Sequence, residues 1–122
     1  TFDELDKLDV GRVYREKNCT NIEQIFANTA TWQPDLPPLD VAFIDGCHDA
    51  EFVYGDTLKV LSCAKPGTVI IWHDYNPELA KVYGHIGEVL TGIRWLIRKK
   101  KIRGIIYHLQ DSFTGVYVVP GK

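Results

Sequence analysis

Cysteine is scarce in this sequence, and its few copies lack the spacing of a structural or metal-binding thiol site. The three cysteines are Cys19, Cys47 and Cys63, an odd number with no C-x-x-C pair among them. Disulfide frameworks use paired cysteines, and thiolate zinc sites use closely spaced ones. We therefore expect reduced thiols and neither of these two kinds of site.

Long apolar runs and an excess of one charge are also lacking. No apolar run approaches the roughly 20 residues that cross a bilayer, and residues 1–6 have neither the basic nor the apolar region of a signal peptide. The 14 Lys and Arg stand against 16 Asp and Glu, a formal net charge of −2, which gives no general attraction to nucleic acid or anionic membranes. We therefore predict a cytoplasmic protein that binds neither nucleic acid nor membranes.

What is present is the composition of an ordinary globular domain. Apolar residues make up 45% of the 122 residues and charged residues 25%, which is enough for a hydrophobic core without disulfides. No internal repeat and no linker-like stretch divides the chain. Residues 1–122 are therefore expected to form a single domain.

Strand-like and helix-like segments alternate along the chain. The expected strands are 22–27, 41–44, 68–72, 105–109 and 115–119, and the expected helices are 53–64 and 78–101. Glycines weaken the start of the second helix, which can lie several residues after Glu78. The run at 41–44 is apolar on both faces, which predicts burial on both sides by helices, and 68–72 is expected to be a second buried strand. Residues 1–18 are expected to be mostly loop, with one helical turn within residues 2–8. This order predicts an α/β fold whose sheet is largely parallel and closes with an antiparallel pair.

Polar side chains follow the two expected buried strands, 41–44 and 68–72, directly. Asp45 and His48 come after the first of them, and His73 and Asp74 come after the second. In open α/β sheets, ligands bind beyond the carboxyl ends of the strands. Strands joined by one helical crossover can be neighbours about 5 Å apart. The two loops are therefore expected to face one site.

Two interpretations of these four side chains are open. Carboxylates and an imidazole can hold a divalent cation, with carboxylate oxygen favouring Mg²⁺ and imidazole shifting the preference toward Mn²⁺, Fe²⁺ or Zn²⁺. Alternatively, Asp45 and Asp74 cap the helices that follow them. His48 is the candidate proton acceptor beside Asp45, since histidine is a common general base, although a loop histidine is often simply solvated.

Two longer motifs surround these residues. Residues 43–56 read Phe-Ile-Asp-Gly-Cys-His-Asp-Ala-Glu-Phe-Val-Tyr-Gly-Asp, and residues 65–75 read Lys-Pro-Gly-Thr-Val-Ile-Ile-Trp-His-Asp-Tyr. They resemble the F-I-D-G-x-H-x-x-E-x-V-x-x-D and K-P-G-G-x-I-x-x-H-D-Y motifs of one branch of the class I S-adenosylmethionine-dependent methyltransferases. Residues 10–15 and 27–29 also resemble upstream stretches of that branch. The resemblance implies a Rossmann-like methyltransferase sheet with S-adenosylmethionine as cofactor.

The resemblance also implies roles for the polar residues. In metal-dependent relatives, the acid after the fourth strand and the polar pair after the fifth bind a cation, which makes Asp45, His73 and Asp74 the metal ligands here, with Mg or Mn as the metal. The base lies three residues after the first acid, at His48. A cation next to a hydroxyl group lowers the pKa of that group, so that a neutral histidine can take its proton.

For the cofactor, the resemblance points to residues in both halves of the chain. The Asn28-Thr29 pair matches a position that lies near the adenine in relatives, and Asp45 is expected to lie beside the cofactor as well. The chain departs from the pattern at Asn28, where relatives have an acid, and at His73, where metal-dependent relatives have a carboxylate. The glycine-rich first strand is not found, since Gly11 stands alone. The resemblance therefore implies a sheet incomplete at its N-terminal side, with 1–122 as the C-terminal part of a methyltransferase-like fold.

Three functions follow from these observations. The first is an S-adenosylmethionine-dependent O-methyltransferase, or a fragment of one, acting on a small hydroxylated substrate with metal assistance. The second is a metal-dependent hydrolase that uses Asp45, His48, His73 and Asp74 around an activated water. The third is a non-catalytic, truncated methyltransferase-like domain that binds a partner or forms a homo-oligomer through an exposed sheet edge.

Overall fold

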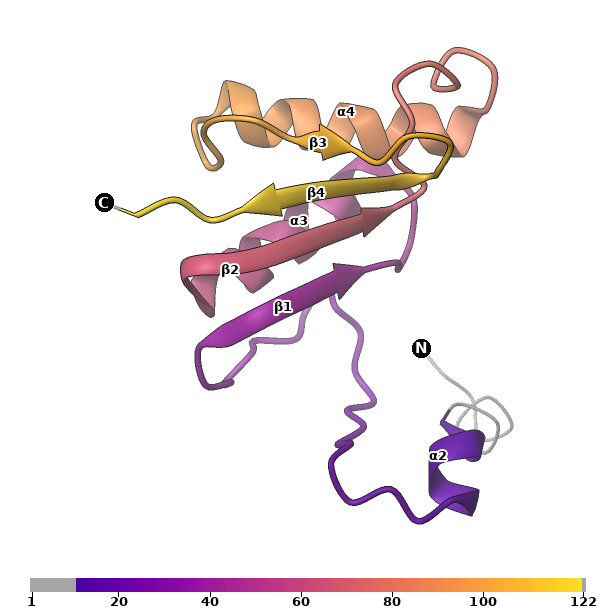
Figure 1. Cartoon of the computed structure of the whole chain (residues 1–122), viewed down its shortest axis with the longest axis vertical. Coiled ribbons are helices and arrows are strands. Elements are labelled where there is room, and N and C mark those ends of the chain that lie inside the picture. Colours follow the sequence, from indigo (N-terminus) through magenta and orange to yellow (C-terminus); the bar gives the residue numbers. More distant parts are fainter. Residues whose placement is uncertain (1–10, 122) are drawn as a thin grey trace. The chain divides into compact units, whose positions relative to one another are not determined.

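The structure is a computed structural model that describes residues 11–121, and the chain forms two compact units, residues 1–32 and 33–122 (Figure 1). In the first unit, α2 (Arg12–Glu16) is a short helix. The Tyr14 hydroxyl donates a hydrogen bond of 2.6 Å to Oε1 of Gln24, which ties this helix to the segment that follows it. The loop expected over residues 1–18 thus contains a helix, while the turn expected within residues 2–8 lies outside the described residues.

The strand expected at residues 22–27 is wrong. This segment is irregular, and the next regular element after α2 begins at Leu39. A strand is stable only when its backbone pairs with a second strand, and the described part of the first unit contains none. The β-favouring side chains of Ile22, Ile25 and Phe26 are exposed instead.

The second unit holds a four-stranded sheet with two helices. Its elements are β1 (Leu39–Ile44), α3 (Ala50–Ser62), β2 (Ala64–His73), α4 (Gly84–Arg98), β3 (Tyr107–His108) and β4 (Thr114–Val118). The strand order is β1-β2-β4-β3. The β1–β2 pair is parallel, and the β2–β4 and β4–β3 pairs are antiparallel. The expected α/β fold, consistent with part of a Rossmann-like methyltransferase sheet, is confirmed.

The start of α4 is delayed by a turn. The Asn76 side chain accepts hydrogen bonds from the backbone N–H groups of Glu78 and Leu79, at 3.0 and 3.2 Å. Such side-chain acceptors favour turns over continuous helix. The helix therefore begins at Gly84, several residues after Glu78 as the glycines indicated.

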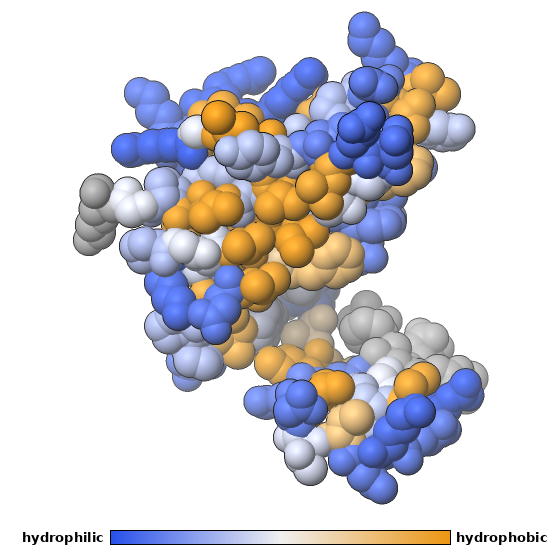
Figure 2. Space-filling model, in the orientation of Figure 1, coloured by the Kyte–Doolittle hydropathy of each residue, from blue (hydrophilic) through white to orange (hydrophobic). Residues whose placement is uncertain are grey.

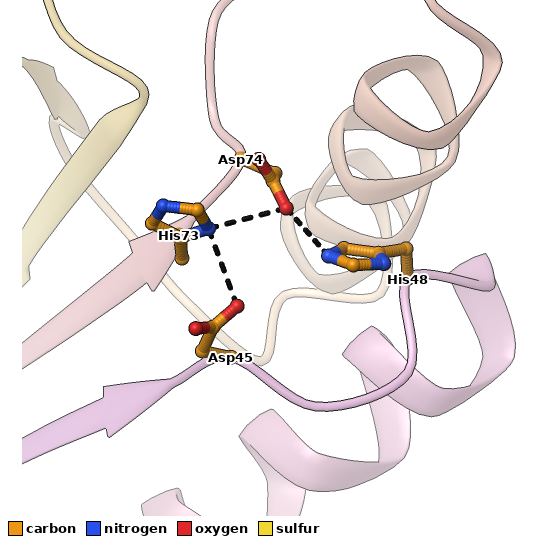
Figure 3. A group of neighbouring side chains, drawn as sticks. All are labelled: Asp45, His48, His73 and Asp74. Atoms are coloured by element: carbon orange, nitrogen blue, oxygen red, sulfur yellow. Dashed lines mark ion pairs between the residues drawn. The ribbon is translucent and has the colours of Figure 1, made fainter.

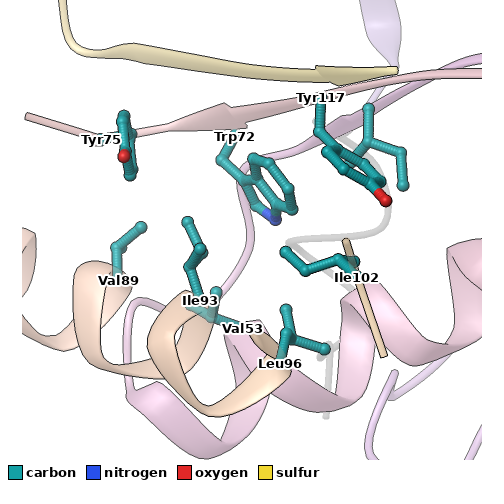
Figure 4. Packing of buried hydrophobic residues seen from close by; sticks show 9 residues of the cluster. Val53, Trp72, Tyr75, Val89, Ile93, Leu96, Ile102 and Tyr117 are labelled. Atoms are coloured by element: carbon teal, nitrogen blue, oxygen red, sulfur yellow. The ribbon is translucent and has the colours of Figure 1, made fainter. Parts of the chain in front are cut away.

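One hydrophobic core lies between the sheet and both helices (Figure 4). Trp72 of β2 is 1% exposed, and Ile93 and Leu96 of α4 pack against it with at most 1% exposure. The Trp72 indole N–H donates a 3.0 Å hydrogen bond to Oγ1 of Thr57 on α3, so its polar group is satisfied within the core. This packing fixes the end of β2, where the candidate site begins.

The other face of the sheet is apolar and exposed. Val41 and Phe43 of β1 are 57% and 59% exposed, and Tyr107 and Val118 are 56% and 48% exposed. Figure 2 shows hydrophobic side chains gathered over this face, and Figure 1 shows both helices behind the strands. The burial expected on both faces of β1 is therefore wrong. The physical reason is that α3 and α4 pack on the same side, and the described part of the second unit has no other helix.

None of the helices in the described residues is both long enough and apolar enough to cross a membrane.

Candidate active site

The site forms where β1 and β2 end side by side. The two strands are parallel, and Ile44 pairs with Trp72 in their register. Asp45, which follows β1, and His73, the last residue of β2, therefore lie at the same end of the sheet, as expected for strands joined by the single crossover α3. The sequence-based prediction that the two loops face one site is confirmed by this geometry.

The four polar side chains converge on a small volume (Figure 3). His73 Nδ1 lies 3.2 Å from Asp45 Oδ1 and 3.1 Å from Asp74 Oδ2. His48 Nε2 lies 2.5 Å from the same Asp74 oxygen. One ligand atom from each residue lies within 4.8 Å of the other three. Asp74 is the least exposed of the four, with 14% of its side chain accessible, and it contacts both histidines.

The polar atoms of the cluster are close together but poorly hydrogen-bonded. His48 Nε2 and His73 Nδ1 are buried, and within the described part of the chain neither has a hydrogen-bond partner. Each nitrogen therefore sits near a carboxylate oxygen without the alignment that a hydrogen bond requires. Buried polar atoms without partners are rare and call for an explanation.

A divalent cation fits this arrangement. Adjacent ligand atoms around an octahedral ion with bonds of about 2.1 Å stand roughly 3 Å apart. The separations of His73 Nδ1 from the Asp45 and Asp74 oxygens are of that size. The donor set of two carboxylates and imidazole nitrogen suits Mn²⁺ and related ions as well as Mg²⁺. Asp45, His73 and Asp74 could therefore hold such an ion.

Helix capping does not account for the two aspartates. The N-cap of α3 is Asp49 and that of α4 is Tyr83, so neither Asp45 nor Asp74 occupies a cap position. Asp74 also adopts a left-handed backbone conformation, with φ of 57°. Such conformations carry a cost for residues other than glycine and concentrate at functional sites. The capping interpretation of Asp45 and Asp74 is therefore wrong.

The cluster rests on the hydrophobic core. A small pocket beneath it is bounded by Asp45 and His48 on the polar side and by Val53, Trp72 and Val89 on the apolar side. Tyr75, which follows Asp74 in the sequence, is 8% exposed. Its burial raises the pKa of the phenol, and the positive charge of Arg94 opposes that rise.

Two further residues at this site were missed by the sequence reasoning. Glu88 of α4 accepts a 3.1 Å hydrogen bond through Oε2 from the backbone N–H of Ala50. The ring of His85, also on α4, stands edge-on to His48 with centroids 5.5 Å apart. Their spacing of three residues places both on one helix face, but the sequence does not indicate that this face meets the segment that carries His48.

The expected adenine-side residues belong to the first unit. Asn28 and Thr29 are exposed, and Asn28 Oδ1 accepts a 2.9 Å hydrogen bond from the Ala30 N–H in a turn. This bond occupies the amide oxygen and leaves the amide nitrogen for other partners. Their role at the cofactor stays a prediction.

Comparison with known proteins identifies the family. Residues 2–75 match a family model described as a methyltransferase domain. The chain belongs to the S-adenosylmethionine-dependent methyltransferase family. The matched residues include Asp45, His48, His73 and Asp74. Searches among curated proteins and among solved structures found no match. The family implies S-adenosylmethionine as methyl donor and a small-molecule substrate.

Proposed function

We propose that this methyltransferase domain transfers a methyl group to a hydroxyl oxygen of a small hydroxylated substrate, with a divalent cation held by Asp45, His73 and Asp74. The observation that carries the proposal is the convergence of two buried imidazole nitrogens, neither with an aligned hydrogen bond, on two carboxylates. A cation among these atoms would be bound by the nitrogen of His73 and would offset the proximity of the two negative charges. When bound, it would also lower the pKa of a hydroxyl group beside it.

His48 is the proposed general base. The imidazole of His48 would accept the proton of the substrate hydroxyl, and the carboxylate of Asp74, 2.5 Å from Nε2, would stabilise the resulting imidazolium. The deprotonated substrate oxygen would accept the methyl group that S-adenosylmethionine supplies when bound, with S-adenosylhomocysteine as the second product. The apolar floor under the cluster excludes water on that side and strengthens these electrostatic interactions.

S-adenosylmethionine is proposed as the cofactor, with the binding residues that the resemblance implies. Asp45 would lie beside it at the strand end, and Asn28 with Thr29 would contact its adenine side, as the resemblance implies. Calorimetric titration with S-adenosylmethionine and with S-adenosylhomocysteine tests this assignment. Asn28→Ala is expected to weaken binding of both ligands, because an amide donor is lost.

The metal assignment is tested by Mn²⁺ titration monitored by electron paramagnetic resonance. Asp74→Asn is expected to weaken Mn²⁺ binding by at least tenfold, since changes even to groups behind the ligands cost roughly 10–100-fold. Asp49→Asn is the matched control, because Asp49 lies in the loop that carries Asp45 and its side chain makes no capping hydrogen bond. Equal Mn²⁺ affinity of the two variants would contradict the proposed site.

Methyl transfer itself is measured with radiolabelled S-adenosylmethionine and a panel of phenols, catechols and sugars. His48→Ala is expected to lower kcat by roughly 100-fold or more, the usual contribution of a general base, with unchanged affinity for the methyl donor. No binding of the donor at millimolar concentration would sink methyl transfer by this chain. Ester or phosphoester turnover that needs both metal and His48 would show a hydrolase instead.

A further inference from the structure

One face of α4 holds the segment that carries His48. His85, Glu88 and Gly92 recur at intervals of three and four residues, so they lie on the same side of the helix. Each of them meets the segment between His48 and Val53. The segment at the start of α3 therefore contacts α4 at three successive levels along that helix. The outer level is His85, the middle level is Glu88 and the inner level is Gly92.

The middle level is a hydrogen bond that replaces a missing cap. The first backbone N–H groups of a helix have no partner within that helix. Asp49 occupies the N-cap of α3, but its side chain makes no capping hydrogen bond. The Glu88 carboxylate accepts from the Ala50 N–H at 3.1 Å instead. A negative charge at this point is also favoured by the helix dipole of α3.

The outer level is a contact between rings. His85 and His48 stand edge to face, with centroids 5.5 Å apart and an interplanar angle of 70°. His48 also reaches Asp74 through Nε2. The imidazole therefore contacts both α4 and the residue that follows β2.

We propose that Glu88 is a positioning residue that, together with His85, holds His48 toward Asp74 by fixing the N-terminal end of α3. Ala50 lies two residues after His48, so a displacement of the Ala50 N–H is transmitted directly to the loop that carries the imidazole. The contacts of Glu88 and His85 described above are with Ala50 and His48, and none of them involves the proposed metal ligands. Their role in catalysis rests on the proposed function of His48, whereas the positioning itself does not.

The test compares Glu88→Ala with Glu88→Gln. Glutamine keeps an oxygen that can accept from the Ala50 N–H, and alanine does not. The probe is the set of imidazole ¹H and ¹⁵N signals of His48, together with the nuclear Overhauser effect between the His48 and His85 rings. In Glu88→Ala we expect displaced His48 signals and loss of this effect, and in Glu88→Gln we expect both as in the unchanged chain. Glu78→Ala, at an exposed acid before α4, is the matched control and is expected to change neither.

Kinetics give the second readout. Misplacement of a reacting group by about 1 Å can cost roughly 100-fold in rate, so Glu88→Ala is expected to lower kcat by about 10- to 100-fold with little change in KM. Glu88→Gln is expected to restore kcat to within about twofold. If Glu88→Ala does not fold, substitutions at the exposed residue His85 provide the same test. We expect a lower kcat in His85→Ala and recovery of kcat in His85→Phe, because phenylalanine keeps a ring at the contact with His48.

The outcomes are distinguishable. Unchanged His48 signals in folded Glu88→Ala would overturn the positioning role, and so would equal effects of alanine and glutamine at position 88. Displaced His48 signals in a chain that transfers no methyl group would support the positioning role and count against the proposed function alone.

Discussion

At the scale of single residues, Tyr75 links the site motif to the stability of the fold. Its phenol is buried beside Gly115 and stands edge-on to His108, with ring centroids 5.9 Å apart. Burial disfavours the charged phenolate and raises the pKa of Tyr75 above its ordinary value of 10.0, while Arg94 partly opposes the shift. In the unfolded chain this burial is absent, so the phenol loses its proton at lower pH there than in the folded chain.

Because the folded pKa is the higher one, the contribution of Tyr75 to stability is complete below about pH 10 and is lost as pH rises through the folded pKa. Urea unfolding between about pH 9 and 11 is expected to show a falling free energy of unfolding. Tyr75→Phe should flatten that fall, and Tyr83→Phe, at an exposed tyrosine, should not. Identical pH slopes in the Tyr75→Phe and unchanged chains would contradict this assignment.

The residues of the site differ in how far the sequence predicts them. Asp45 and His73 could be predicted because each directly follows an apolar strand, and the parallel register then places them together. Glu88 and His85 could not, since their partners are 38 and 37 residues away and depend on how α3 packs against α4. Ala50 donates through its backbone N–H, so the residue type at position 50 does not indicate this hydrogen bond.

At the scale of elements, glycine determines how closely α3 and α4 approach. A Cβ added at Gly92 would lie 2.7 Å from the carbonyl oxygen of Ala50 and 2.9 Å from Cβ of Val53. Neither a backbone carbonyl nor a Cβ can move without shifting a helix. The close packing that brings Glu88 to Ala50 thus depends on the absence of a side chain one turn later.

Alanine substitutions at two helical glycines test this packing. Gly92→Ala is expected to lower the free energy of unfolding, because overpacking costs about 1–3 kcal/mol and better helix propensity returns only about 1 kcal/mol. Gly55→Ala on α3 is the matched control, since a Cβ there meets nothing within 4 Å, and it should raise stability by roughly 0.5–1 kcal/mol. Denaturant unfolding measures both. A stabilising Gly92→Ala would contradict the close contact.

Elements were predictable where local pattern and tertiary pairing agree. The apolar run at 41–44 predicts a strand, and that strand pairs with β2. The spacing of apolar residues over 53–64 predicts a helix, and that helix packs its apolar side chains into the core. The segment 22–27 has the side chains of a strand but no described partner in its unit, and β propensity reports fit to a sheet more than a backbone preference. Local sequence therefore could not decide whether a strand forms there.

At the scale of the whole second unit, the two faces of the sheet differ in a way the sequence did not show. Both faces of β1 and β2 carry apolar side chains, which predicted helices on both sides. The structure places α3 and α4 on one side and leaves Phe43, Val41, Tyr107 and Val118 exposed on the other. Figure 2 shows hydrophobic side chains gathered over this other side. An apolar run predicts that a strand has an apolar face, but it does not indicate which element covers that face. Contiguous apolar surface of this kind favours association.

Association through this face is the last prediction. We expect concentration-dependent self-association of the chain, and we expect Phe43→Lys combined with Val118→Lys to shift it toward the monomer, because burying an unpaired charge in an interface is unfavourable. Both side chains point away from the core, so the free energy of unfolding should change little. Sedimentation equilibrium measures the association. Val82→Lys is the control, since Val82 is 68% exposed on the loop before α4 and lies outside the sheet. A chain that stays monomeric at millimolar concentration, or a Val82→Lys variant that dissociates as far as the double variant, would show that this face does not drive association.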